Sequence, residues 1–158
     1  MPVLLPEDYK YKLPKMYTVR QNFPDEHLEN PEKILRESLD REEIRSLVKP
    51  GMKTAVAVGS RGITGISQIV KITVDFLKEL GVSPFIVSAM GSHGGGTKEG
   101  QREVLAGYGI TEEAMGVPVV TDTDTVDLGV NEDGNHVWFD RAAYESDLII
   151  PINRVKLH

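Results

Sequence analysis

A single histidine lies in a glycine-rich stretch in the middle of the chain, residues 90–100 (MGSHGGGTKEG). Histidine changes its charge near neutral pH, so His93 is suited to take or give a proton during a reaction. Its neighbours, Ser92 and several glycines, are small enough to let a substrate approach the imidazole ring. The alternative is a tight turn without a ligand, in which His93 is structural or simply exposed.

The same glycines come directly before a predicted helix, whose first N–H groups and positive dipole end favour an anion. The phosphate-loop motif ends in Gly-Lys-Ser/Thr, whereas the order here is Gly96-Thr97-Lys98. The dinucleotide motif Gly-x-Gly-x-x-Gly is also absent from this stretch. The common nucleotide motifs therefore do not match, although glycines at a helix start still allow an anionic ligand.

Two further polar stretches contain groups that could bind a substrate. Residues 59–62 (GSRG) place Arg61 beside Ser60, and the planar guanidinium of an arginine can hold a carboxylate or a phosphate with two parallel hydrogen bonds. A surface ion pair is the alternative role for Arg61. Lys156 and His158 close the chain and are either a second polar pair or its frayed end.

The segments around these residues indicate an α/β fold with a parallel sheet. Short apolar runs that are typical of buried strands occupy residues 54–58, 84–90 and 148–153. Apolar residues at three- and four-residue spacing predict a helix over residues 65–81, with Thr64 as its N-cap and Gly81 at its end. A second helix is predicted over residues 98–106.

The remaining segments predict smaller elements and a β-hairpin insertion. Residues 31–47 favour one or two short amphipathic helices, and residues 111–115 a helical turn. Residues 117–121 and 126–130 are β-like, and Asp133-Gly134 predicts a hairpin with a two-residue turn. Residues 1–30, rich in proline and charge, are expected to form an extended arm with a candidate edge strand at residues 16–20. Residues 31–158 then form the α/β domain.

This organisation predicts where the polar groups meet. Ligands of open parallel sheets bind beyond the carboxyl ends of the strands. Each of the three polar stretches follows such an end, so their side chains are expected to converge on one rim. The candidate residues are Ser60, Arg61, Ser92, His93, Thr97, Lys98, Asn153, Arg154, Lys156 and His158.

Length and composition exclude several classes of protein. The 158 residues suffice for one domain, and the net charge of −6 argues against a nucleic-acid partner. The chain has no cysteine, which excludes disulfides, thiolate nucleophiles and cysteine-ligated zinc and agrees with a cytoplasmic location. The sequence shows neither a signal peptide nor an apolar run of the length that a membrane helix needs.

Four segments together resemble the N-terminal part of the nickel-pincer lactate racemase family, which includes many members of unassigned substrate. They are GSRGI (59–63), MGSHGGGTKEG (90–100), QREVLAGYG (101–109) and VKLH (155–158). The resemblance covers most of the chain from about residue 15. It implies the N-terminal domain of a two-domain enzyme, a 2-hydroxy-acid racemase or epimerase.

In that family a nickel-pincer nucleotide (nickel pyridinium-3,5-bisthiocarboxylic acid mononucleotide) takes a hydride from the carbinol carbon of the substrate and returns it to either face. Two histidines exchange the hydroxyl proton, one for each enantiomer. The resemblance assigns these catalytic roles to His93 and His158, and substrate binding to Arg61 with Ser60. It also implies that the cofactor contacts Ser92, Gly94, Gly95 and Lys156, and that proteins of cofactor biosynthesis are partners.

The sequence departs from the family pattern in two places. Val58 stands where lactate racemase has an acidic residue, and Leu157 stands where a proline is frequent before the second histidine. Both differences argue against lactate itself as the substrate.

The resemblance places the cofactor-tethering lysine and the nickel-binding histidine beyond His158, so no metal ligand is assigned here. We expect the 158 residues alone to fold but not to racemise a substrate. Two alternatives stay open: a non-enzymatic anion- or metabolite-binding module, and an α/β enzyme without nickel that acts on a phosphorylated or carboxylated metabolite.

Overall fold

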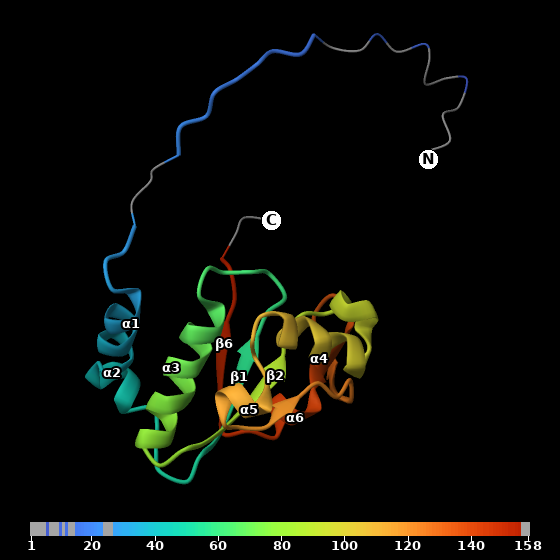
Figure 1. Cartoon of the computed structure of the whole chain (residues 1–158). Helices are drawn as coiled ribbons and strands as arrows, with labels where there is room; N and C mark the ends of the chain where they lie inside the picture. Colours follow the sequence, from blue (N-terminus) through green and yellow to red (C-terminus); the bar gives the residue numbers. More distant parts are fainter. Residues whose placement is uncertain (1–5, 7–9, 11, 13–14, 24–26, 156–158) are drawn as a thin grey trace.

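The computed structural model describes residues 6, 10, 12, 15–23 and 27–155 of the chain. Its centre is a four-stranded sheet with the strand order β3-β2-β1-β6, in which every neighbouring pair is parallel (Figure 1). The strands are β1 (Lys53–Val58), β2 (Ser83–Ser88), β3 (Val119–Val120) and β6 (Leu148–Ile152). A two-stranded antiparallel hairpin accompanies the sheet. The predicted α/β fold with a hairpin insertion is confirmed.

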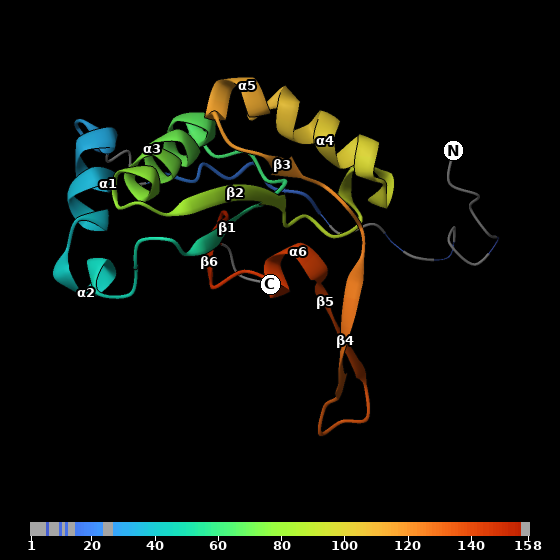
Figure 2. The same cartoon turned by 90° about the horizontal axis from the view of Figure 1, so that it is seen from below.

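Helices α3 (Ile66–Glu79), α4 (Lys98–Gly107) and α5 (Glu112–Met115) cover one face of the sheet (Figure 2). Helix α1 (Pro31–Leu39) packs against α3, and α2 (Glu42–Arg45) follows α1 at the same end of the molecule. The apolar stripe of α3, which includes Val70, Val74 and Leu77, packs on Val56 and Ile86 of the two central strands in the main core. Burial of this stripe explains the three- and four-residue spacing of the sequence.

The sequence predicted one of the two ends of α3 correctly. The predicted end is confirmed: Gly81 has a left-handed φ of 76°, and its N–H donates to the Lys78 carbonyl oxygen at 3.0 Å. The predicted start is wrong. The N-cap is Gly65, with φ 73° and no side-chain cap, so Thr64 lies one residue outside the helix and its hydroxyl does not cap the first turn.

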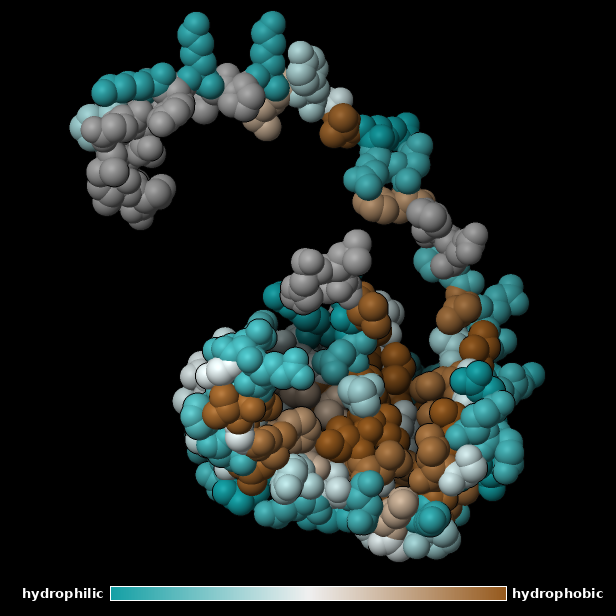
Figure 3. Space-filling view, turned by 180° about the vertical axis from the view of Figure 1, so that it is seen from behind, coloured by the Kyte–Doolittle hydropathy of each residue, from teal (hydrophilic) through white to brown (hydrophobic). Residues whose placement is uncertain are grey.

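Fewer elements pack on the opposite face of the sheet. Helix α6 (Arg141–Tyr144) packs there with a small cluster that includes Ala57, Phe85 and Val87, and the hairpin projects away from the same face (Figure 2). Apolar side chains consequently reach the surface on this side (Figure 3). Tyr144 of α6 and Ile149 of β6 are both exposed.

The hairpin consists of β4 (Thr125–Val130) and β5 (His136–Asp140). Its predicted two-residue turn at Asp133-Gly134 is wrong, because Val130 pairs with His136 and residues 131–135 form the connection. The side chain of Asn131 accepts hydrogen bonds from the backbone N–H groups of Asp133 (3.1 Å) and Asn135 (2.9 Å). These bonds from Asn131 stabilise the longer loop. The Asp-Gly pair alone therefore predicted a turn that is too short.

The candidate edge strand at residues 16–20 is also wrong. These residues are exposed, belong to no strand, and lie in a segment that leads away from the domain (Figure 1). An alternating sequence forms a strand only where another strand pairs with it. Within the described part of the chain, no helix is both long enough and apolar enough to cross a membrane.

Candidate functional site

The carboxyl ends of β1, β2 and β6 lie side by side. In the parallel register, Val58 is the partner of both Ser88 and Ile152. The segments that follow, residues 59–62, 89–97 and 153–155, therefore begin at the same edge of the sheet. The predicted position of these described segments at one edge of the sheet is confirmed, and the convergence of their side chains stays a prediction. Lys156 and His158 lie outside the described residues.

Close backbone contacts join the loops at this rim. The Gly59 N–H donates to the Ile152 carbonyl oxygen at 3.2 Å. A Cβ atom on Gly59 would lie only 1.8 Å from the side-chain oxygen Oδ1 of Asn153, so the Asn153 amide occupies the space that a side chain at position 59 would need. The loops after β1 and β6 thus form one packed unit, and Asn153 has a structural role in it.

The glycine-rich loop has an unusual backbone. His93–Gly96 forms a kinked 3-10 segment before α4, and Gly94, Gly95 and Gly96 have φ values of 65°, 69° and 65°. Three successive residues in the left-handed region require glycine, since other L-residues pay about 1–2 kcal/mol each for this conformation. Thr97 then caps α4, accepting the Gly100 N–H at 3.1 Å.

The three glycines differ in what surrounds them. A Cβ atom on Gly94 would lie 2.5 Å from the carbonyl carbon of Gly100, so this glycine is needed where the loop packs against the first turn of α4. By contrast, a Cβ atom on Gly95 or Gly96 would have no atom within 4 Å. The outer side of the loop is therefore open, next to the unpaired N–H groups of the first helical turn.

The reactive side chains of the rim are available to a ligand. His93, Arg61 and Ser92 are exposed, and within the described part of the chain their side chains make no hydrogen bond or ion pair. Lys98, in contrast, forms an ion pair with Asp122. The rim therefore combines the His93 imidazole with the unpaired guanidinium of Arg61, in loops that follow neighbouring strands. Lys98 is already paired.

Two residues that the sequence prediction missed link these loops to α4. The Gln101 side chain bonds to Ser88 and Gly91, and the Tyr108 hydroxyl donates to the Ser60 carbonyl oxygen at 2.5 Å. A signal for Gln101 exists in the sequence. It occupies the buried face of an amphipathic helix, where a polar side chain needs partners.

The Glu112 carboxylate also bonds to a side chain of α4. It accepts hydrogen bonds from the Val119 N–H (3.2 Å) and from Arg102 (3.5 Å). These bonds, the backbone bond first, lower the pKa of Glu112 below its ordinary value of 4.5. Glu112 thus joins α4 and α5 to strand β3.

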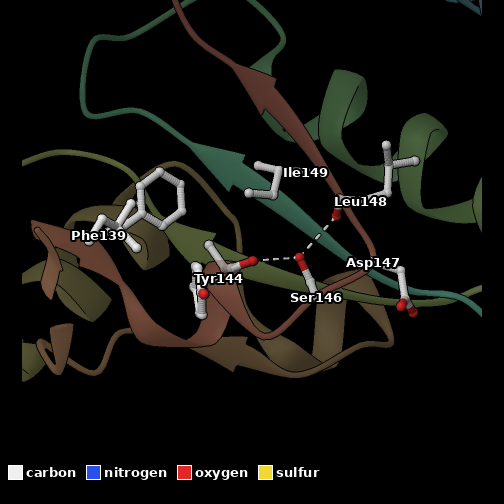
Figure 4. Close-up of a pocket in the computed structure, with 8 residues that line it drawn as sticks. Phe139, Tyr144, Ser146, Asp147, Leu148 and Ile149 are labelled. Atoms are coloured by element: carbon white, nitrogen blue, oxygen red, sulfur yellow. Dashed lines mark hydrogen bonds between the residues drawn. The ribbon is translucent and has the colours of Figure 1, made fainter. Parts of the chain in front are cut away.

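A hollow of about 430 Å³ lies elsewhere, on the sparsely covered face of the sheet at the start of β6. Phe139 from the hairpin, Tyr144 from α6 and Ile149 from β6 surround it (Figure 4). Its serine, Ser146, already donates to the Ala143 carbonyl oxygen at 2.7 Å. Chemistry is therefore better supported at the rim. Among the described residues, no group of three His, Cys, Asp or Glu side chains could hold a metal ion.

Comparison with known protein families gives a match to the lactate racemase N-terminal domain over residues 6–158. The chain belongs to the lactate racemase N-terminal domain family. The resemblance that four short segments suggested is thus confirmed over almost the whole chain. No curated protein and no solved structure matches the chain.

Membership of the lactate racemase family changes how the rim is interpreted. At the family level it indicates a racemase, which is an isomerase. His93 and Arg61 follow β2 and β1, two adjacent strands. The fold therefore brings together the family segments that contain the histidine and the arginine.

Proposed function

We propose that this domain supplies the substrate-facing side of a 2-hydroxy-acid racemase or epimerase site. The observation that carries the proposal is that His93 and Arg61 follow the carboxyl ends of two adjacent parallel strands, both without a side-chain partner in the described part of the chain. Family membership supports an isomerase, and the two side chains support a substrate with a carboxylate and an exchangeable proton.

In this proposal each rim residue has a separate task. The Arg61 guanidinium binds the substrate carboxylate through two parallel hydrogen bonds, with Ser60 beside it. His93 accepts the proton of the substrate hydroxyl from one enantiomer and returns it in the reverse direction. His158, outside the described residues, performs the same transfer for the other enantiomer.

The glycine-rich loop fits the family's nickel-pincer nucleotide. Open space beside Gly95 and the start of the ten-residue helix α4 suit the phosphate of a mononucleotide. We therefore propose that Ser92, Gly94, Gly95 and Lys156 contact this group. When bound, it supplies a hydride acceptor for the carbinol carbon of the substrate. The chain's own residues hold the carboxylate, move the hydroxyl proton and keep the substrate in place.

Conversion of single enantiomers tests the function. Cofactor-loaded protein that contains this domain is incubated with pure D- or L-forms of a series of 2-hydroxy acids, and the products are separated by chiral chromatography. We expect at least one acid to be interconverted in both directions. If carboxylates or phosphates bind but none of the acids is converted, the chain is a binding module and the racemase proposal is wrong.

A further inference from the structure

Helix α4 and the C-cap residue that ends it, Tyr108, contact the two rim loops through polar side chains. Gln101 is only 6% exposed; its Nε2 donates to the Gly91 carbonyl oxygen at 2.8 Å, and its Oε1 accepts from the Ser88 hydroxyl at 2.5 Å. The Tyr108 hydroxyl donates to the Ser60 carbonyl oxygen at 2.5 Å. One bond therefore lies two residues before His93, and the other lies one residue before Arg61.

Gln101 lies in the first half of α4, and Tyr108 follows the helix directly as its C-cap. Seven positions separate Gln101 from Tyr108, which is close to two turns of an α-helix. Between them Leu105 is fully buried in the main core and fixes the helix against the sheet. The helix thus offers a rigid support that runs from the β2 loop to the β1 loop.

The sequences of the two loops do not by themselves fix one backbone conformation. Glycines flank the Ser60-Arg61 pair at positions 59 and 62, and glycines stand on both sides of Ser92-His93 at positions 91 and 94. Glycine has the largest conformational freedom of any residue, so the chain on its own would not hold Arg61 and His93 in one arrangement. Bonds from a packed helix to the backbone beside each residue remove that freedom.

We propose that Gln101 and Tyr108 are positioning residues, which hold His93 and Arg61 in mutual register. Gln101 fixes the backbone that leads to His93, and Tyr108 fixes the backbone that leads to Arg61. The roles of His93 and Arg61 in this proposal rest on the proposed function. The link between the loops and α4, through the hydrogen bonds of Gln101 and Tyr108, does not depend on that function. A shift of the order of 1 Å in such a constellation is enough to lower a rate about 10²-fold.

Amide hydrogen exchange tests the link without any cofactor. Tyr108→Phe removes one hydroxyl and keeps the ring, so exchange should become roughly two- to tenfold faster over residues 59–62 and stay unchanged over residues 91–93. Gln101→Met should make exchange faster over residues 91–93 and leave residues 59–62 unchanged. Tyr144→Phe, at an exposed tyrosine of α6, is the matched control and should change neither loop. If Gln101→Met loosens the whole domain, Ser88→Ala replaces it, because it removes only one bond to Gln101.

Kinetics of the cofactor-loaded protein separate positioning from general destabilisation. Tyr108→Phe should act mainly on KM, because Arg61 binds the substrate, and Gln101→Met mainly on kcat, because His93 transfers the proton. Wild-type exchange rates in both loops of both variants, or faster exchange across the whole sheet in Tyr108→Phe and in Ser88→Ala, would overturn the proposal. Local changes in exchange without racemisation by the wild-type protein would support the link and reject the proposed function instead.

Discussion

At the scale of single residues, the rim depends on side chains that the fold leaves unengaged. Arg61 makes no hydrogen bond or ion pair in the described part of the chain, whereas Arg36 pairs with Glu79 and Arg45 with Asp40. A guanidinium that the protein does not use retains all its donors for a ligand. The contrast among these arginines is therefore a reason to assign substrate binding to Arg61.

Arg61→Lys tests this assignment. Lysine keeps the positive charge but lacks the planar pair of donors, so the affinity for a 2-hydroxy acid or an unreactive carboxylate analogue should fall roughly tenfold or more. Isothermal titration calorimetry of both proteins measures the change. Arg45→Lys, a change at an arginine that is already paired, serves as the control. If Arg61→Lys binds as tightly as the wild type, Arg61 is only a surface charge.

At the scale of elements, the glycine-rich loop and α4 form one unit. Gly94 and Gly100 touch where any side chain would collide, and Gly95 needs its left-handed backbone although space is available beside it. Steric exclusion and backbone strain are therefore separate reasons for glycine in the same loop, and substitutions can distinguish them.

Three alanine substitutions measure these contributions. Gly95→Ala should lower the free energy of unfolding by about 1–2 kcal/mol through strain alone. Gly94→Ala should cost more, because its Cβ atom would also meet the Gly100 backbone at 2.5 Å. Gly107→Ala, in α4 with free space around it, should raise stability by about 0.5–1 kcal/mol. Urea unfolding of the three variants gives the order, and equal costs for Gly94→Ala and Gly95→Ala would contradict the close packing.

Local patterns predicted most of these elements and failed where distant contacts decide. The apolar run that became β1 and the glycine that ends α3 were predictable, because burial and a left-handed turn leave a clear mark on the sequence. The strand expected at residues 16–20 did not form, since strand pairing depends on a distant segment. Helix α6 was not predicted from the sequence. Tyr108 was missed for a similar reason, because its partner Ser60 is 48 positions away.

At the scale of the whole molecule, the two faces and the rim have separate tasks. The helical face contains the main core, the opposite face carries the hairpin and exposed apolar side chains, and the rim holds the polar groups (Figures 2 and 3). The parallel order of β2, β1 and β6 is what brings residues from distant parts of the sequence to one edge. The proposed function therefore depends on the sheet topology as much as on His93 and Arg61.

The most direct test of this account is the rate at which cofactor-loaded protein converts a single enantiomer of its 2-hydroxy acid. His93→Ala should lower that rate by roughly 10²–10⁴-fold, because it removes the group that exchanges the hydroxyl proton. The control, His136→Ala, changes an exposed histidine of the hairpin and should leave the rate unchanged. Chiral chromatography over time measures both. Equal rates for His93→Ala, His136→Ala and the wild-type protein would contradict the assignment of proton transfer to the rim.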